Sequence, residues 1–200
     1  MSVSLVDCVI SQASGGVGIN NNNAVVTING LDTSNATLVA LLATASAGVS
    51  DVEMLVVTMS SMGTVALTTS QGQLNVRSSM ILDNIQFSDV FVGREAGTKL
   101  TIDNLEVLMN TRILDKWNVV FVETGSSVAV TNSRIGGNLQ MTSAVMASEM
   151  GLASISDTKI FSNNGVSTVV LASFFVRSNC SLTAFRTDFP LSERSCICHQ

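Results

Sequence analysis

The feature that most constrains the fold of this chain is a short apolar pattern that recurs along most of its length. Each copy occupies eight positions: apolar, any, apolar, three mostly polar positions, any, apolar. Copies begin at Val3, Val26, Val57, Leu74, Leu100, Val128, Ala153 and Leu182, and those at Val26 and Val57 are weaker. The mean step of about 26 residues is typical of a solenoid, in which each repeat forms one coil and packs on its neighbours.

The second apolar position of each copy gives the expected register of the coils. It falls at Leu5, Ile28, Met59, Val76, Ile102, Val130, Ile155 and Ala184. The step that leads to Met59 is the longest of the series and the step that follows it is the shortest. Together these two steps cover two ordinary periods, so the Met59 copy is a candidate for a slipped register. Eight coils then account for almost the whole chain.

An asparagine stands at one fixed phase of four consecutive repeats, three residues after the last apolar position. The four residues are Asn84, Asn110, Asn138 and Asn163. Asparagine suits a turn because its amide imitates a backbone turn and because it tolerates the left-handed backbone region. If coils stack about 4.8 Å apart, each side-chain amide can donate to the next, which predicts a hydrogen-bonded asparagine ladder.

Turn-forming residues recur at the fifth position of the pattern, where the first strand of each coil must bend. This column consists of Asp7, Gly30, Ser61, Ser78, Asn104, Asn132, Asp157 and Arg186. Each repeat also carries a second apolar run, and several of these runs are followed by a glycine, at Gly72, Gly97, Gly125 and Gly151. Every unit therefore reads as short strands joined by turns.

These regularities predict an all-β fold, a parallel β-helix of about eight coils of ~26 residues. We expect this domain over residues 1–190 and a cysteine-containing C-terminal tail over 191–200. An antiparallel sandwich would need closely spaced hairpin turns and would not place an asparagine at the same phase of successive long repeats. The segment Ser34–Ala47 has helical potential and is expected to form a helix or a protruding loop.

Composition narrows the classes of partner. The net charge is −5, every Lys and Arg lies at or beyond Arg77, and aromatic residues make up 4% of the chain. Nucleic-acid binding is not expected, because it needs a basic patch. Only 12% of residues are charged, which is compatible with neutral partners such as glycans, or with self-association. No cofactor motif occurs, and His199 is the single histidine, so neither a cofactor nor a metal site is expected.

The remaining motifs concern location and modification. The thiols of Cys180, Cys196 and Cys198 are either free or joined in one disulfide, from Cys180 to one of the other two. Sequons for N-glycosylation begin at Asn35 and Asn179. No apolar run is long enough to span a membrane, and no signal peptide is visible. Because the pattern starts inside a strand, we interpret the chain as a fragment of a longer protein, or as one whose start codon is placed too late.

The repeat of apolar strand, turn residues, asparagine, second apolar strand and glycine turn resembles the right-handed parallel β-helix of the pectin-lyase-like superfamily. The likeness runs from Val3 to about Phe189. It looks most like the long β-helix stretches of large secreted or cell-surface proteins from microbes. The resemblance implies a right-handed coil and a secreted or cell-surface location.

Enzymes of that superfamily act on acidic polysaccharides with carboxylates and a basic residue on one outward face. The fourth pattern position faces outward and places Arg77 and Asp103 on adjacent coils, with Asp157 two coils from Asp103 at the neighbouring position. A catalytic interpretation makes Asp103 and Asp157 an acid pair and Arg77 a substrate contact. The alternative is a surface ion pair beside an unrelated turn aspartate, and we favour it because one aspartate per face is too few.

Three functional hypotheses follow. The first is a structural or binding module of a larger secreted or cell-surface protein, with a polysaccharide or a cell-surface protein as its partner. The second is a degenerate polysaccharide lyase or hydrolase, although catalysis is not the expectation. The third is self-association through the ends of the solenoid.

Overall fold

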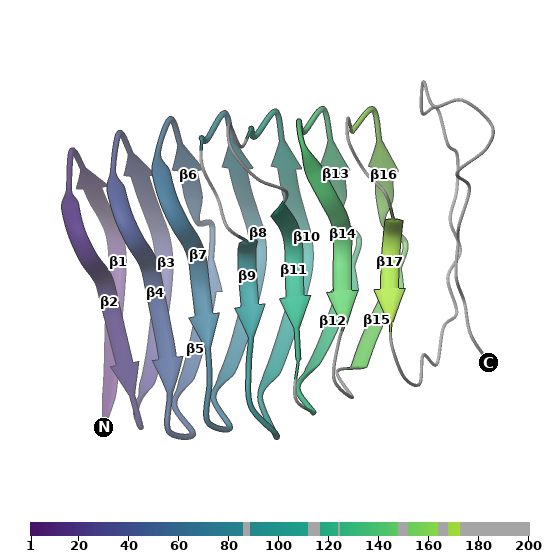
Figure 1. Cartoon of the computed structure of the whole chain (residues 1–200). Helices are drawn as coiled ribbons and strands as arrows, with labels where there is room; N and C mark the ends of the chain where they lie inside the picture. Colours follow the sequence, from purple (N-terminus) through teal and green to yellow (C-terminus); the bar gives the residue numbers. More distant parts are fainter. Residues whose placement is uncertain (86–88, 112–116, 124, 148–151, 164–167, 173–200) are drawn as a thin grey trace.

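A computed structural model describes residues 1–85, 89–111, 117–123, 125–147, 152–163 and 168–172. All regular structure in these residues is β-strand. The strands form two facing parallel sheets, A and B, with the apolar core between them. In Figure 1 the chain ascends in the more distant sheet, descends in the nearer one and advances from left to right, which makes the solenoid right-handed.

Sheet A holds ten strands and sheet B seven. The strands of sheet A are β1 (Ser2–Ser11), β3 (Val25–Ser34), β5 (Val49–Glu53), β6 (Val56–Thr58), β8 (Gln73–Leu82), β10 (Lys99–Leu108), β12 (Ser127–Thr131), β13 (Arg134–Gly136), β15 (Leu152–Ser156) and β16 (Lys159–Phe161). The strands of sheet B are β2 (Ser14–Asn22), β4 (Thr37–Ala45), β7 (Ser61–Thr68), β9 (Asp89–Gly93), β11 (Trp117–Val122), β14 (Met141–Ala147) and β17 (Thr168–Ala172). The parallel β-solenoid predicted from the repeat is therefore confirmed.

The described solenoid completes about six turns, fewer than the predicted eight coils. Successive coils start at β1, β3, β5, β8, β10, β12 and β15, and we number them one to seven in that order. The aligned core positions are Leu5, Ile28, Val52, Val76, Ile102, Val130 and Ile155. The predicted eighth coil, at Ala184, lies outside the described residues.

The register predicted for the third coil was wrong. Val52, not Met59, aligns with Ile28 and Val76. A serine hid this copy of the pattern, because Ser50 occupies the first apolar position. Its hydroxyl is fully buried but bonded, to Asn21 Nδ2 at 2.9 Å and to Thr44 Oγ1 at 2.7 Å. A polar residue is stable at this core position because its hydrogen bonds are made inside the protein.

The helix or loop expected over Ser34–Ala47 is also not present. This segment contains β4, which pairs with β2 and β7 and buries Leu38, Ala40 and Leu42 at alternate positions. Leucine and alanine favour helices in isolation, but pairing between two neighbouring parallel strands overrides that preference. The unit contains no insertion, since its apparent extra length came from the slipped register.

Two corners with left-handed backbone bound a short segment of every coil. The first corner is formed by Asp7, Gly30, Met54, Ser78, Asn104, Asn132 and Asp157, with φ between 48° and 74°. The second is formed by Gln12, Asn35, Met59, Asp83, Met109, Gly137 and Ser162, with φ between 46° and 64°. The spacing from the first corner to the second is the same in all seven coils, and it equals the spacing from Asp7 to Gln12. The turn-forming column predicted from the sequence is thus the first corner, with Met54 in place of Ser61.

The predicted asparagine ladder is present directly after the second corner. The Nδ2 atoms of Asn84, Asn110 and Asn138 donate to the Oδ1 atom of the next asparagine at 3.0, 3.1 and 2.9 Å, ending at Asn163. Each of these oxygens also accepts the backbone N–H of the preceding rung. All four side chains are at most 5% exposed, so the ladder satisfies polar groups that water cannot reach.

The ladder has one further rung that the sequence reading missed. Ser60 precedes Asn84 in the column, and its backbone N–H donates to Asn84 Oδ1 at 2.9 Å. The Ser60 hydroxyl accepts the N–H of Ala36 at 3.1 Å. Serine ends the column because its single oxygen accepts from the previous coil but carries no amide to extend the ladder.

A second column of buried side chains supports the first corner with hydroxyl groups. Ser79 and Ser133 accept the backbone N–H groups of Leu55 and Leu105 at 3.2 and 3.1 Å. Each hydroxyl donates in turn to a carbonyl two residues before it, at 2.8 and 2.7 Å. Both sharp bends of the coil are therefore held by buried side chains as well as by the strand ladders.

Replacement of Asn138 by Leu should lower the free energy of unfolding by about 1–3 kcal/mol. The change removes the acceptor for Asn110 and the donor to the Val107 carbonyl, and both groups stay buried. Urea denaturation measures the loss. Asn22→Leu is the matched control, because Asn22 is exposed on β2. Equal midpoints for the two variants would contradict the stabilising role of the ladder.

Replacement of Met54 by Asn should raise the free energy of unfolding by about 0.5–1 kcal/mol. Met54 has a φ of 53°, where a side chain without a local hydrogen bond is disfavoured and asparagine is tolerated. The thermal unfolding midpoint reports the gain. The same substitution at Met80, which lies in the extended strand β8, should give no gain. A lower midpoint for Met54→Asn would refute this explanation.

Candidate functional site

The candidate surface is the outward side of sheet A before the first corner, here called the polar face. The side chains of this face form rows that run across the coils. The middle row consists of Ser4, Thr27, Asp51, Asn75, Thr101, Ala129 and Ser154. The row next to the first corner consists of Val6, Asn29, Glu53, Arg77, Asp103, Thr131 and Ser156. In the third coil, Asp51 and Glu53 take the places that the slipped register gave to Thr58 and Ser60.

The charged centre of the polar face is one row of three residues on consecutive coils. Arg77 lies opposite Glu53 on one side and opposite Asp103 on the other. Parallel neighbours in a sheet are about 4.8 Å apart, so the guanidinium has a carboxylate on each side. Within the described residues, the Arg77 guanidinium makes no hydrogen bond or close ion pair. Its donors are therefore free to bind an incoming polar group.

The carboxylate of Asp103 is held in its ionised form. Its Oδ1 accepts a hydrogen bond from Thr131 Oγ1 at 2.7 Å and one from Asn132 Nδ2 at 2.8 Å. These two bonds, and to a smaller extent the positive charge of Arg77, lower the pKa of Asp103 below its ordinary value of 3.8. At neutral pH this group can accept hydrogen bonds, but it carries no proton to donate as a general acid.

A second carboxylate–amide pair lies in the middle row of the polar face. Asn75 Nδ2 donates to Asp51 Oδ1 at 2.7 Å across the third and fourth coils. The face therefore presents fixed acceptors from Asp51 and Asp103 on either side of the Arg77 donors. Hydrogen bonds between neighbouring coils orient both carboxylates, which leaves fewer side-chain conformations to lose on binding.

Asp157 lies at the first corner of the seventh coil rather than on the polar face. It is exposed and has a φ of 49°. Two coils separate it from Asp103, whose hydrogen bonds go instead to the intervening coil. The structure thus brings together Arg77, Asp103 and Glu53, and leaves Asp157 apart.

The other residues singled out from the sequence have separate locations. Asn35, which begins a sequon, is exposed at the second corner. Cys8 is half-buried with a free thiol in the first coil. The sequon at Asn179, the cysteines at 180, 196 and 198, and the tail over 191–200 all lie outside the described residues.

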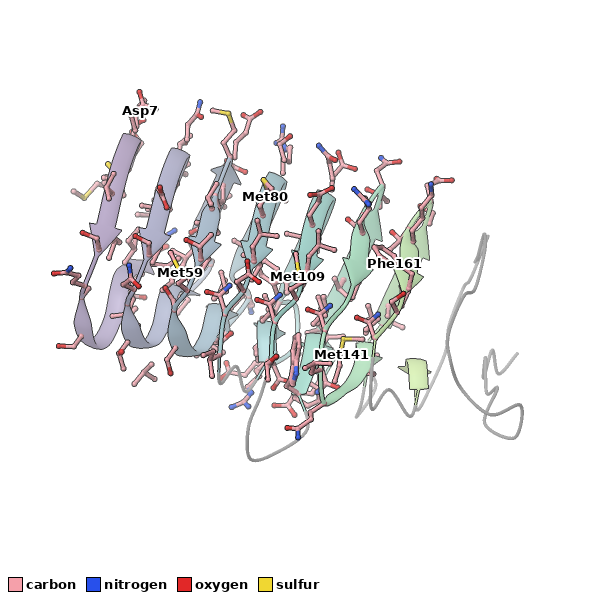
Figure 2. All side chains as sticks on the ribbon, turned by 90° about the horizontal axis from the view of Figure 1, so that it is seen from above. Asp7, Met59, Met80, Met109, Met141 and Phe161 are labelled. Atoms are coloured by element: carbon pink, nitrogen blue, oxygen red, sulfur yellow. The ribbon has the colours of Figure 1, made fainter. Side chains whose placement is uncertain are left out.

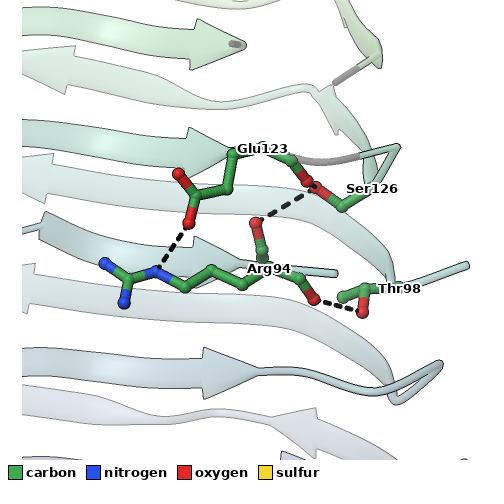
Figure 3. A network of polar contacts seen from close by, with 5 residues as sticks. Arg94, Thr98, Glu123 and Ser126 are labelled. Atoms are coloured by element: carbon green, nitrogen blue, oxygen red, sulfur yellow. Dashed lines mark hydrogen bonds and ion pairs between the residues drawn. The ribbon is translucent and has the colours of Figure 1, made fainter. Parts of the chain in front are cut away.

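A different polar network lies at the turns that follow sheet B (Figure 3). Arg94 Nε contacts Glu123 Oε1 at 3.1 Å, and Thr98 Oγ1 donates to the Arg94 carbonyl at 2.7 Å. Ser126 Oγ donates to the Gly93 carbonyl at 3.1 Å. Because the hydroxyls are satisfied by turn carbonyls and the ion pair is surface-exposed, this network fixes the turns and contributes little else.

The described residues contain neither a membrane-spanning helix nor a metal-binding cluster. No segment among them forms a helix with the length and apolar character that a membrane crossing requires. In the same part of the chain, no group of three or more His, Cys, Asp and Glu side chains is arranged to hold a metal ion.

Sequence reasoning missed the functional candidates Asp51 and Glu53. The signal was present, since Val49 and the two acidic residues alternate with Ser50 and Val52, but the buried Ser50 broke the apolar pattern.

No family model matches the chain, and neither a curated protein nor a solved structure matches it.

Asp103→Asn should make stability less dependent on acid. A carboxyl group with a lowered folded-state pKa adds stability above its ordinary pKa, and the contribution is lost as the pH falls below 3.8 through the folded value. The urea midpoint of the native chain should therefore exceed that of the variant near neutral pH, and the gap should narrow as the pH falls below 3.8.

The matched control for this acid titration is Asp157→Asn, because the Asp157 carboxylate accepts no hydrogen bond within the described residues. Its gap to the native chain should be smaller near neutral pH. A gap for Asp103→Asn that stays constant from neutral to acid pH would contradict the proposed role of its hydrogen bonds.

Proposed function

We propose that the chain is a rigid β-solenoid binding module of a larger secreted or cell-surface protein, and that its polar face binds a neutral polysaccharide. The observation that carries the proposal is the row Glu53, Arg77 and Asp103, with free arginine donors between two carboxylates. Hydroxyl groups of a sugar both donate and accept, so alternating donors and acceptors at coil spacing suit them.

The charge of the polar face favours a neutral ligand over an acidic one. Asp51, Glu53 and Asp103 outnumber Arg77 at the centre of the face, and one negative charge remains in excess when Lys99, on the adjoining outward row, is included. A polyuronate would therefore meet net repulsion there. The outward rows contain no aromatic residue over the described coils, which makes hydrogen bonding, not ring stacking, the expected source of affinity. Binding through hydrogen bonds on an open face is expected to be weak for one site and to gain from an extended ligand.

The ladders supply the stiffness that such a module needs. Side chains at one phase of the repeat are fixed by the backbone of their own coil and by the next coil. A repeating ligand laid along the axis would meet the same spacing of about 4.8 Å at every coil. The likeness to the pectin-lyase-like β-helix supports only the location of binding, along an outward face. The preference for a neutral ligand rests on the charges of the polar face.

The alternative function is a degenerate polysaccharide lyase or hydrolase. It draws on the carboxylates of Glu53 and Asp103, which lie two coils apart, on the order of 10 Å. Inverting glycosidases hold their carboxyl groups at about 6.5–9.5 Å. Arg77 lies on the coil between the two groups, and the lowered pKa of Asp103 makes that carboxylate unsuited to act as a general acid. Binding without turnover is therefore the favoured function.

Affinity electrophoresis in gels containing neutral glucans, mannans or polyuronates tests the proposal. We expect a neutral polysaccharide to retard the chain, and Arg77→Ala to weaken binding about tenfold or more, as loss of charged hydrogen bonds does. Arg94→Ala is the matched control, because Arg94 is a half-exposed arginine outside the polar face.

The same gels distinguish the competing outcomes. Equal retardation of the Arg77→Ala and Arg94→Ala variants would place binding elsewhere, and no retardation by any neutral polymer would refute the glycan proposal. Parallel incubation with polyuronates, with and without calcium, tests the alternative. Turnover abolished by Asp103→Ala would establish catalysis instead.

A further inference from the structure

A second outward surface lies between the two corners of each coil and is here called the methionine face. Its first row consists of Val9, Asp32, Val56, Met80, Glu106, Arg134 and Lys159. Its second row consists of Ser11, Ser34, Thr58, Leu82, Leu108, Gly136 and Phe161. The proposed polysaccharide face makes no use of these residues, because the first corner separates the two surfaces.

The centre of the methionine face carries solvent-exposed apolar side chains, next to the carboxylates of Glu106 and Asp83. Met80 is 37% exposed, and the corner residues Met59 and Met109, on the coils before and after it, are 61% and 58% exposed. Figure 2, viewed from above, shows these side chains on neighbouring coils, with Phe161 farther along the solenoid on the same face. Exposed methionines in one patch are unusual on a free surface and typical of protein interfaces, because the flexible thioether packs on varied partners.

The arrangement of the face is nearly symmetric about the fourth coil. Met59 in the third coil and Met109 in the fifth occupy the same corner position on either side of Asp83. Met80 and Leu82 lie on the fourth coil itself. A two-fold axis parallel to the strands at this coil would place Met80 against its own copy and Met59 against Met109.

Two of the four charged residues in the first row are complementary under the same operation, which also places Glu106 opposite Val56 and Lys159 opposite Val9. Asp32 lies in the second coil and Arg134 in the sixth, both in the first row and both exposed. The two-fold axis brings Asp32 of one chain opposite Arg134 of the other, twice. Arg134 is already oriented, since it pairs with Glu106 at 2.8 Å and lies 5.7 Å from the Phe161 ring centre.

We infer that the methionine face is an interface between two copies of this chain, related by a two-fold axis at the fourth coil. A self-complementary patch is what an isologous dimer requires. The apolar centre would be removed from water, and the Asp32–Arg134 pairs at the rim would fix the antiparallel register of the two solenoids. This association is side by side and leaves both ends of the solenoid unused.

The size of the face predicts a weak and reversible dimer. The segment between corners is only a few residues wide, so the buried area falls at or below the lower limit of stable interfaces, about 1,200 Å². The carboxylate of Asp83 also lies opposite its own copy near the axis, and this repulsion opposes association. Because burial of Met80 favours the dimer and repulsion between the Asp83 carboxylates opposes it, one variant should weaken association and another should strengthen it.

Sedimentation velocity from about 10 μM to about 1 mM, where weak complexes dissociate, measures the association. The native chain is expected to move from monomer to dimer with no larger species. Met80→Glu places two carboxylates on the axis and should raise the dissociation constant at least about tenfold. Asp83→Asn should lower it, and asparagine retains the left-handed backbone at that corner.

Val39→Glu is the matched control, because Val39 is 66% exposed on β4 of the opposite sheet. It should dimerise like the native chain. A native chain that stays monomeric at the highest concentration would overturn the inference. A Met80→Glu variant that associates as strongly as Val39→Glu would do the same.

Cross-linking distinguishes this dimer from association through the solenoid ends. Under mild oxidation, Met80→Cys should give a disulfide-linked dimer faster than Val39→Cys, since residue 80 meets its own copy on the axis and residue 39 does not. Both variants carry the same four native cysteines, so background cross-linking is shared. Equal rates, or polymers that lengthen with concentration, would show that the chains meet elsewhere.

Discussion

The whole structure depends on hydrogen bonds from buried side chains to the backbone at the second corner. A parallel solenoid must bend its chain inside each coil, and a bend interrupts the regular strand pairing at a place that water does not reach. The asparagine column solves this problem in four coils, because each amide donates and accepts at once. Coils that lack asparagine, such as that of Ser60, make fewer of these bonds.

Fixed corners give each outward surface its own chemistry. Because every coil bends at the same two positions, rows of side chains on either side of a corner point in different directions and vary independently. The row before the first corner is charged around Arg77, and the segment after that corner carries exposed methionines around Met80. The proposed glycan surface and the proposed dimer surface therefore occupy one solenoid without sharing a residue.

The fold could be predicted from the sequence because apolar residues and asparagines recur at positions where stacked coils require buried or hydrogen-bonded side chains. An asparagine at one phase of four successive repeats implied stacked coils, and the hydrogen bonds of Asn110 and Asn138 show why. Residues that break a pattern but find partners elsewhere were harder to interpret. The buried Ser50 hydroxyl forms hydrogen bonds with Asn21 and Thr44 of sheet B, and the sequence around Ser50 does not predict these bonds.

The candidate site was less predictable for the same reason. Arg77 and Asp103 could be placed on adjacent coils from their phase alone, but Glu53 depended on the register of the third coil. The hydrogen bonds that hold Asp103 ionised come from Thr131 and Asn132, one coil away. Such contacts depend on side-chain direction across coils, which a linear pattern does not contain.

The constant distance between the two corners determines where this chain can change in length. Successive first corners are unevenly spaced, since Gly30 follows Asp7 more closely along the chain than Asn132 follows Asn104. None of this variation falls between the two corners of a coil, where the spacing is the same in every described coil. A residue inserted there would turn inward-facing side chains outward and break the amide column, whereas the stretches beyond the ladder already differ in length from coil to coil. Engineered insertions are therefore expected to be tolerated better on the sheet B side of the solenoid than between the two corners.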